Sequence, residues 1–126
     1  MKVDLHRFDN TEIVIHNLER YEQTVHIKLF EVLKQRGLTL SDLHRLTGIR
    51  NASLSELANG RKFSLNIVHI VVIMQALRIT DIRELFDVEF SPETVEKWNE
   101  EMKHHDSGLT SKQLEETNEN LKMINK

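Results

Sequence analysis

The chain contains 126 residues, of which 39% are hydrophobic and 29% charged, with one Pro, four Gly and a net charge of −3 at pH 7. This length fits one ordinary domain or a small domain with extensions, and the composition indicates a soluble, mostly helical protein rather than a disordered, collagen-like or β-rich one. Because the chain has no cysteine, we exclude a disulfide framework, a thiolate metal site and a cysteine nucleophile.

Neither a secretory signal nor a membrane span is expected. The first residues open no long apolar run. The most apolar stretch, residues 67–76, is interrupted by His69 and Gln75 and is about half as long as a bilayer-spanning helix. Together with the absence of cysteine, these features lead us to expect a cytoplasmic protein.

Charge is distributed unevenly along the chain. Residues 28–62 contain seven basic and three acidic residues, whereas residues 81–126 contain six basic and twelve acidic residues. A locally basic segment favours a nucleic-acid partner, although the surfaces of helices also vary this much by chance. The charge pattern is therefore supporting evidence only.

Residues 1–18 are predicted to form an N-terminal arm or hairpin. Two short segments rich in β-branched or alternating residues, 2–5 and 12–15, are separated by Asp9-Asn10, which favours a turn.

A domain spanning residues 19–90 is predicted to follow, and its first helix spans residues 19–36. The apolar residues recur at helical spacing, and Gly37 is placed to end the run. These apolar residues are Tyr21, Val25, Leu29, Val32 and Leu33.

Two short helices joined by a glycine turn are predicted next. Thr39 and Asp42 have the spacing of a capping box at the start of the first helix. Gly48 can adopt the positive φ that a tight turn between helices requires. The second helix spans residues 51–58 and ends at Asn59-Gly60.

Two further helices complete the predicted domain. Ser64 is placed to cap a helix that ends near Leu77, and Thr80 is placed to cap a shorter one that ends near Phe86. Five helices then enclose one core, and we predict an all-α fold.

Residues 91–126 are predicted to form a C-terminal helix pair that serves dimerisation or partner binding. Ser91-Pro92 places a cap before a proline at the first helical position. Ser107-Gly108 ends this helix, and Thr110 with Gln113 has the spacing of a second capping box.

Residues 40–59 have the architecture of a helix-turn-helix, in which the second helix enters the major groove of DNA. The segments LHRLTGI (43–49) and LSELANGRK (54–62) resemble the Cro/cI-like (lambda-repressor-like, XRE) family. The resemblance covers roughly residues 25–86 and implies a five-helix lambda-repressor-like DNA-binding domain.

Three residues depart from the family pattern. Leu46 stands where the family usually has an acidic or basic residue, two positions before the turn glycine. His44 stands where the family usually has Ala, at a point where the two helices pack closely. Arg50 stands where the family usually has a Ser or Thr cap, so that the recognition helix starts either there or one residue later, with Asn51 as the cap.

The outward face of the second helix presents residues suited to reading bases. Arg can donate two hydrogen bonds to guanine, Asn can pair with adenine, Ala can contact a thymine methyl group, and Glu can accept from cytosine. Asn51 can instead serve as an N-cap, and Glu56 can be a solvated surface residue. The candidate base-reading residues are Arg50, Asn51, Ala52, Ser55 and Glu56.

Phosphate contacts are expected beside this face, from amides at the start of the preceding helix and from cations beyond the recognition helix. The cations can also belong to an ordinary solvated turn. The candidate DNA-backbone residues are Thr39, Ser41, Asn59, Arg61 and Lys62.

A homodimer is expected, because one recognition helix reads only a few base pairs. The helix at 67–77 is apolar around more of its circumference than one core requires. We expect the outer side of this helix to be buried by a second subunit, by the N-terminal arm or by the tail. Residues 98–114 of the tail also resemble the helical hook by which Sin-type repressors and their antirepressors dimerise. The candidate interface residues are Val71, Met74, Trp98, Met102, Leu114, Leu121 and Ile124.

Catalysis and metal binding are not expected. The seven His residues are scattered or adjacent, and no spaced carboxylate completes a ligand set. No glycine-rich phosphate loop or Ser-His-Asp arrangement is evident. We therefore predict no cofactor, no metal and no enzymatic activity.

The resemblance implies a transcriptional regulator, more specifically a repressor that binds an inverted-repeat operator as a homodimer. The alternative is an antirepressor, antitoxin or phage regulatory module that acts mainly by binding another protein through its tail.

Overall fold

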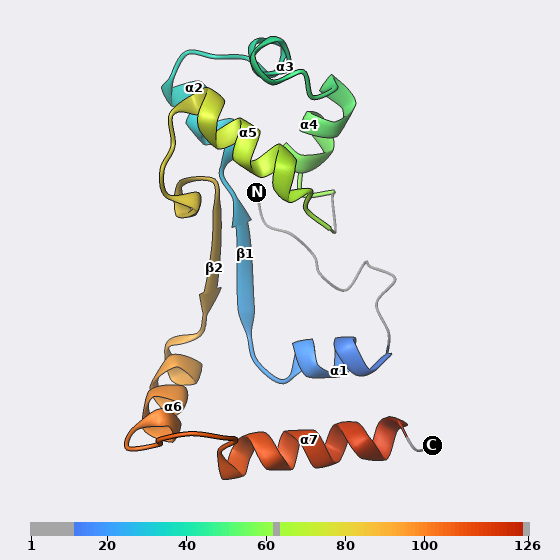
Figure 1. Ribbon diagram of the computed structural model, residues 1–126, viewed down its shortest axis with the longest axis vertical. Helices are drawn as coiled ribbons and strands as arrows, with labels where there is room; N and C mark the ends of the chain where they lie inside the picture. Colours follow the sequence, from blue (N-terminus) through green and yellow to red (C-terminus); the bar gives the residue numbers. More distant parts are fainter. Residues whose placement is uncertain (1–11, 62–63, 125–126) are drawn as a thin grey trace. The chain divides into compact units, whose positions relative to one another are not determined.

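The computed structural model describes residues 12–61 and 64–124 (Figure 1). In chain order, the elements are α1 (Glu12–Glu19), β1 (Gln23–Ile27), α2 (Leu29–Gln35), α3 (Leu40–Thr47), α4 (Asn51–Ala58), α5 (Ile67–Leu77), the 3-10 helix η2 (Ile82–Glu84), β2 (Phe86–Phe90), α6 (Pro92–Met102) and α7 (Ser111–Ile124).

Strands β1 and β2 pair in a two-stranded sheet, so the fold is mostly helical rather than all-α as predicted. The arrows of the two strands point in opposite directions in Figure 1. Backbone hydrogen bonds flank the pair at both ends, from the Lys28 amide to the Leu85 carbonyl (2.8 Å) and from the Ser91 amide to the Glu22 carbonyl (3.3 Å). Residue numbers thus rise along β1 while those of the paired residues fall along β2, so the two strands are antiparallel.

The prediction of one helix over residues 19–36 is wrong in its first half. Residues 23–27 form β1, and the helix α2 begins at Leu29. The segment Thr24-Val25-His26-Ile27 is rich in β-branched residues, which favour a strand when a partner strand is present. That partner, β2, lies far along the chain at residues 86–90, so the spacing of apolar residues around 23–27 carries no sign of it.

The helix predicted over residues 80–86 is only the short 3-10 helix η2. Its cap is Asp81 rather than Thr80, since the Asp81 Oδ1 atom accepts from the Arg83 amide at 3.0 Å. Leu85, which directly follows η2, is buried, and the chain then continues as β2.

The predicted arm or hairpin at residues 1–18 is corrected for its last part. Residues 12–19 form α1, although the run Ile13-Val14-Ile15 favours a strand by composition. The rest of that prediction, at residues 1–11, lies outside the described residues.

The chain divides into two compact units by its internal contacts. Unit 1 contains Thr24–Glu89, and unit 2 contains the described parts of Asp9–Gln23 and Phe90–Lys126. Within the described residues, the boundaries between the units fall at the start of β1 and at the end of β2.

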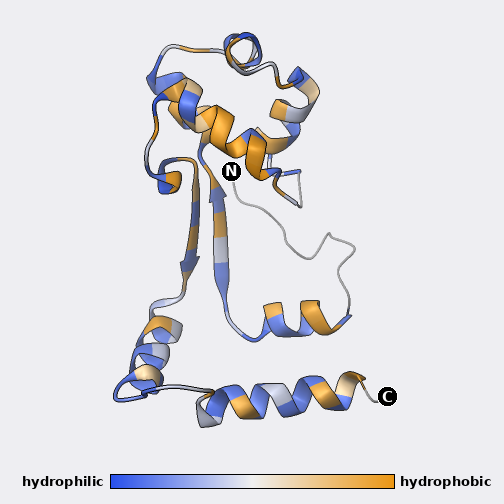
Figure 2. Cartoon of the chain, in the orientation of Figure 1, coloured by the Kyte–Doolittle hydropathy of each residue, from blue (hydrophilic) through white to orange (hydrophobic). Residues whose placement is uncertain are grey.

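The core of unit 1 is formed by α2 to α5, with contributions from the end of β1 and from Leu85. Leu43 of α3 and Leu54 of α4 are completely buried. Helix α5 starts at Ile67, where Asn66 rather than Ser64 is the cap, because the Asn66 side chain accepts from the amides of Val68 and His69. Figure 2 shows α5 as a largely apolar helix.

Unit 2 contains both predicted tail helices. Ser91 caps α6 and accepts from the Thr94 amide, with Pro92 at the first position as predicted. Thr110 and Gln113 form the predicted capping box of α7, with reciprocal hydrogen bonds of 2.9 and 3.1 Å.

Polar side chains connect α7 to α1 and to the residue that follows it in unit 2. The Asn17 side chain donates to the Asn120 Oδ1 atom (3.0 Å). Arg20, just after α1, pairs with Glu119 at 3.1 Å and lies 3.8 Å from Glu116. Polar side chains therefore connect α7 to α1 and Arg20, whereas Leu114, Leu121 and Ile124 of α7 are exposed.

In the described parts of the chain, no helix combines the length and the apolar character that a membrane crossing needs.

Candidate nucleic-acid interface

The turn between α3 and α4 has the geometry predicted for a helix-turn-helix. Gly48 ends α3 with φ of 78°, and its amide donates to the His44 carbonyl at 2.8 Å. A residue with a Cβ atom would be strained at this φ. Ile49 follows with its side chain buried in the core of unit 1.

Two side chains of α3 hold this turn by hydrogen bonds. The His44 Nδ1 atom donates to the Ile49 carbonyl at 2.6 Å. The Thr47 hydroxyl donates to the Leu43 carbonyl at 2.7 Å and accepts from the Ile49 amide at 3.1 Å. The departure from the family pattern at His44 thus provides a direct link from α3 to the turn.

Helix α4 has a buried side and an outward side. Leu54, Leu57 and Ala58 are buried. The candidate base-reading residues lie on the outward side, as their helical spacing predicts: Arg50, Asn51, Ala52 and Glu56 are exposed, and Ser55 is half-buried.

The N-cap of α4 is Arg50, so the alternative start of the helix, with Asn51 as the cap, is not observed. Arg50 has extended backbone angles, its side chain makes no capping hydrogen bond, and Asn51 is the first helical residue. An arginine side chain has no acceptor atom and cannot receive a hydrogen bond from the helix amides. The first amides of α4 and the Arg50 guanidinium are therefore both positioned to act as donors at the same end of the helix.

The end of α4 is stabilised by Asn59. Its side-chain amide donates to the Ser55 carbonyl at 2.9 Å and to the Ser55 hydroxyl oxygen at 3.3 Å. The Ser55 hydroxyl can still donate one hydrogen bond, and the Asn59 carbonyl oxygen can still accept. Gly60 then reverses the chain with φ of 68°.

The start of α3 has exposed donors beside the candidate site. The predicted capping box is confirmed: the Thr39 hydroxyl accepts from the Asp42 amide at 3.1 Å, and the Thr39 amide donates to the Asp42 carboxylate at 2.9 Å. Thr39 and Ser41 are exposed. The box leaves the amides of Leu40 and Ser41 as first-turn donors for an anion.

A carboxylate also lies at this helix start. Hydrogen bonds from the Thr39 backbone and side chain, and from Arg45, hold the pKa of Asp42 below its ordinary value. Arg45 pairs with Asp42 at 2.5 Å. The pair was not predicted from the sequence, although the spacing of three residues on one helix is typical of such pairs. It offsets the negative charge where a phosphate would approach.

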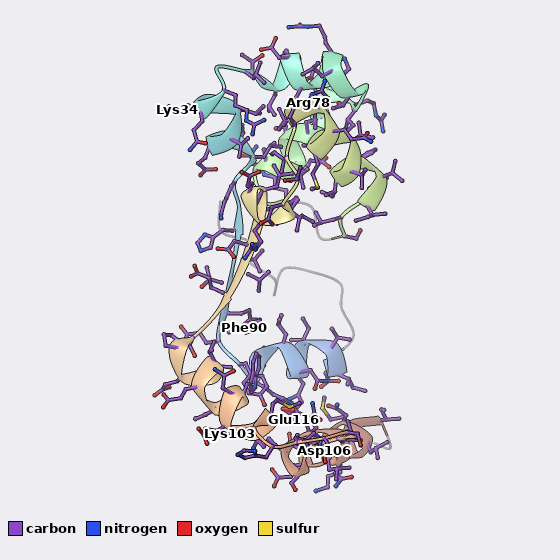
Figure 3. All side chains as sticks on the ribbon, turned by 60° about the vertical axis from the view of Figure 1, so that its left-hand side comes forward. Lys34, Arg78, Phe90, Lys103, Asp106 and Glu116 are labelled. Atoms are coloured by element: carbon purple, nitrogen blue, oxygen red, sulfur yellow. The ribbon has the colours of Figure 1, made fainter. Side chains whose placement is uncertain are left out.

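Beyond α4, Arg61 is exposed, and its amide donates to the Glu56 carbonyl at 2.9 Å. Lys62, the other predicted cation, lies outside the described residues. Lys34 and Arg36 add exposed cations at the end of α2 (Lys34 is labelled in Figure 3). Among the described residues of unit 1, the exposed cations of this basic segment are Lys34, Arg36, Arg45, Arg50 and Arg61.

The candidate interface residues fall into two groups. Val71, Met102, Leu114, Leu121 and Ile124 are exposed. Met74 packs partly against the core of unit 1. Trp98 is half-buried between the rings of Tyr21 and Phe90. Met74 and Trp98 therefore also serve packing within their own units.

Comparison with known proteins gives one match. Residues 28–93, just over half of the chain, match the family model described as a Cro/C1-type HTH DNA-binding domain. No curated protein and no solved structure matches the chain significantly. The matched segment contains α2 to α5 and so includes every candidate DNA-contacting residue.

Proposed function

The chain belongs to the family of Cro/C1-type HTH DNA-binding domains, and from this membership we propose that it is a sequence-specific transcriptional repressor that binds an inverted-repeat operator as a cytoplasmic homodimer. The observation that carries the proposal is the outward side of α4, which presents exposed Arg50, Asn51 and Glu56. In the part of the chain that the structure describes, no hydrogen bond or ion pair engages the side chains of Arg50 and Asn51.

These side chains match the donor and acceptor pattern of the major groove. Arg50 donates two hydrogen bonds to guanine, and Asn51 pairs with the N6 and N7 atoms of adenine. Ala52 contacts a thymine methyl group, Glu56 accepts from the cytosine amino group, and the Ser55 hydroxyl donates to either kind of base.

Phosphate contacts fix the register of α4 in the groove without selecting a sequence. The free amides at the start of α3, with the side chains of Thr39 and Ser41, bind the backbone on one side. Asn59, Arg61 and Lys62 bind it on the other. If a dimer neutralises about six phosphates, log K falls with log salt at a slope of about −5.

Support for a homodimer comes from α7. The side of this helix that contacts its own unit carries Gln113, Glu116 and Asn120. Its apolar residues Leu114, Leu121 and Ile124 are 50%, 47% and 59% exposed. An apolar stripe on a helix gains stability only by burial, and two copies of α7 in one dimer cover each other's stripes.

The decisive experiment is selection of fragmented genomic DNA from the source organism on the purified full chain. The test variant is Arg50→Ala/Asn51→Ala. The matched control is Lys97→Ala/Asn99→Ala, which removes the same charge and the same amide from exposed positions of α6. We expect enrichment of one inverted-repeat sequence by the wild type and the control, and its loss in the test variant.

The same selection separates the proposal from the alternative of a protein-interaction module. Enrichment without a shared sequence motif leaves only non-specific DNA binding by the family's domain. If no DNA is enriched, the exposed stripe on α7 is better explained as the binding surface of an antirepressor or antitoxin.

A further inference from the structure

Unit 2 contains a cavity that the DNA-binding proposal does not use. Its volume is about 280 Å³. It is lined by two aromatic rings, two carboxylates, one thioether and one amide, contributed by Tyr21, Trp98, Glu101, Met102, Gln113 and Glu116. Glu116 of α7 and Phe90 are both labelled in Figure 3. Phe90 does not line the cavity, but its ring packs against the ring of Trp98.

The aromatic rings meet at steep angles instead of stacking. The centroids of the Tyr21 and Trp98 rings are 4.9 Å apart with 70° between the ring planes. Phe90 packs on Trp98 at 4.8 Å and 61°. Two rings at such an angle form a corner, and the faces of indole and phenol rings attract cations through their negative electrostatic potential.

The two carboxylates are positioned mainly by neutral donors. Glu101 accepts from the Thr110 hydroxyl at 2.6 Å, and Thr110 is itself only 6% exposed. Glu116 accepts a short hydrogen bond from the Tyr21 hydroxyl. A hydroxyl orients a carboxylate but leaves its negative charge uncompensated.

Positive charge at this cavity is scarce. Neither Lys nor Arg is among the residues that line it. Arg20 lies 3.8 Å from one oxygen of Glu116, whereas Glu101 has no ion pair in the described parts of the chain. The hydrogen bond to Glu116 and burial raise the pKa of Tyr21 above its ordinary value, so the phenol stays protonated and continues to donate.

We propose that this cavity binds the cationic head of an organic molecule, a guanidinium or alkylammonium group. The faces of Trp98 and Tyr21 contact the cation, Glu101 and Glu116 supply the opposite charge, and Met102 contacts the apolar stem. An anionic ligand is repelled by the two carboxylates, and a neutral ligand leaves the charge of Glu101 without a partner in the described residues. A metal ion is disfavoured, because no group of three metal-ligating side chains is found in the described residues. The inference does not depend on DNA binding.

The test uses the fluorescence of Trp98, which is the only tryptophan of the chain. The full-length protein is titrated with n-propylguanidinium and with n-butylammonium at constant ionic strength. N-propylurea, a neutral molecule of similar shape, and sodium chloride are the reference titrations. We expect a saturable change in emission with the two cations and none with the references.

The test variant is Glu101→Gln, which removes the charge but keeps an oxygen that can accept from Thr110. The matched control is Glu100→Gln, an exposed neighbour on α6 that does not line the cavity. We expect Glu101→Gln to raise the dissociation constant at least tenfold and Glu100→Gln to leave it unchanged. A circular-dichroism spectrum and melting temperature equal to those of the wild type show that Glu101→Gln is folded. If it unfolds, Glu116→Gln is used, since it also keeps an acceptor for Tyr21.

The source of the cation is distinguished by a capped Gly-Arg-Gly peptide. If the natural ligand is a basic side chain of another protein, the peptide binds at least as tightly as n-propylguanidinium. If the ligand is a small molecule, the peptide binds more weakly than the free cation. The proposal is overturned if no cation gives a saturable response, if N-propylurea gives the same response, or if folded Glu101→Gln binds as well as the wild type.

Discussion

The imidazole Nδ1 atom of His44 lies 2.6 Å from the carbonyl oxygen of Ile49, so α3 is hydrogen-bonded to the turn that precedes α4. The Ile49 side chain is buried in the core of unit 1, while its backbone is held by His44 and Thr47. Both contacts act on the residue that sets where the recognition helix begins.

Replacement of this histidine is expected to destabilise unit 1. His44→Ala removes the hydrogen bond to Ile49 and lowers the free energy of unfolding by about 1 kcal/mol, since the carbonyl can regain only a water partner. Chemical denaturation of the full chain measures the change. An unaltered midpoint would mean that the His44 contact contributes nothing to the stability of the turn.

A charge-preserving substitution separates sequence reading from general affinity. Arg50→Lys keeps the positive charge but loses the two-pronged geometry that matches guanine. The binding free energy of the selected operator is compared with that of a duplex in which this guanine is replaced. We expect the difference between the two to shrink by about 1–3 kcal/mol in the variant, while the salt slope stays unchanged. Fluorescence anisotropy with both duplexes at several salt concentrations measures this. Equal preference in wild type and variant would remove Arg50 from base reading.

The opposite behaviour is expected for Arg61, which is proposed to contact phosphate. Arg61→Ala should weaken binding to all duplexes by a similar factor and reduce the magnitude of the salt slope by about 1 per subunit. The same anisotropy measurements apply, with Arg78→Ala, an exposed cation at the end of α5, as the control. A change confined to one base position would contradict a phosphate role.

Acid sensitivity is expected at Asp81, which caps η2. Hydrogen bonds from the Arg83 side chain and backbone lower its pKa from 3.8 to about 2. A carboxylate whose pKa is lower in the folded state stabilises the fold above its unfolded-state pKa and loses this effect as the pH falls toward its folded-state pKa. The stability difference between wild type and Asp81→Asn should therefore be constant above pH 5 and shrink between about pH 4 and 2.

Denaturation curves across this pH range provide the measurement. Asp106→Asn is the control, because this exposed aspartate has no ion pair in the described residues. A difference between wild type and Asp81→Asn that does not vary with pH would contradict the role of the Asp81–Arg83 pair.

Substitution of the exposed stripe on α7 is expected to separate a homodimer into monomers. Leu114→Ser/Leu121→Ser removes apolar surface that the isolated unit leaves half exposed, so the dimer loses buried area while the monomer loses little stability. Sedimentation velocity over a range of concentrations reports the mass, and Lys112→Ser/Lys122→Ser, on exposed polar positions of the same helix, serves as control. If the two variants dimerise with the same dissociation constant, the subunit contact lies elsewhere, and α5 is the next candidate.

The parts of the fold that could be predicted are those set by neighbours in the sequence. The capping boxes at Thr39 and Thr110 and the glycine turn at Gly48 depend on contacts between residues three to four positions apart. The two sides of α4 follow from helical periodicity. For this reason the helix-turn-helix and the placement of its candidate base-reading residues were accessible without coordinates.

The remaining features depend on partners distant in the chain. Val25 fits the spacing of a helix as well as the composition of a strand, and its state was decided by pairing with β2. Similarly, α1 is helical despite its β-branched run and packs on α7 through Asn17 and Asn120. The cavity beside Trp98 is lined by residues 21, 98, 101, 102, 113 and 116. The sequence by itself determined the local turns and caps of this protein, because their energies arise within one or two helical turns. Only the tertiary structure decided the strands, the packing of α1 and the cavity, because their energies arise from burial and pairing between segments that the linear order keeps apart.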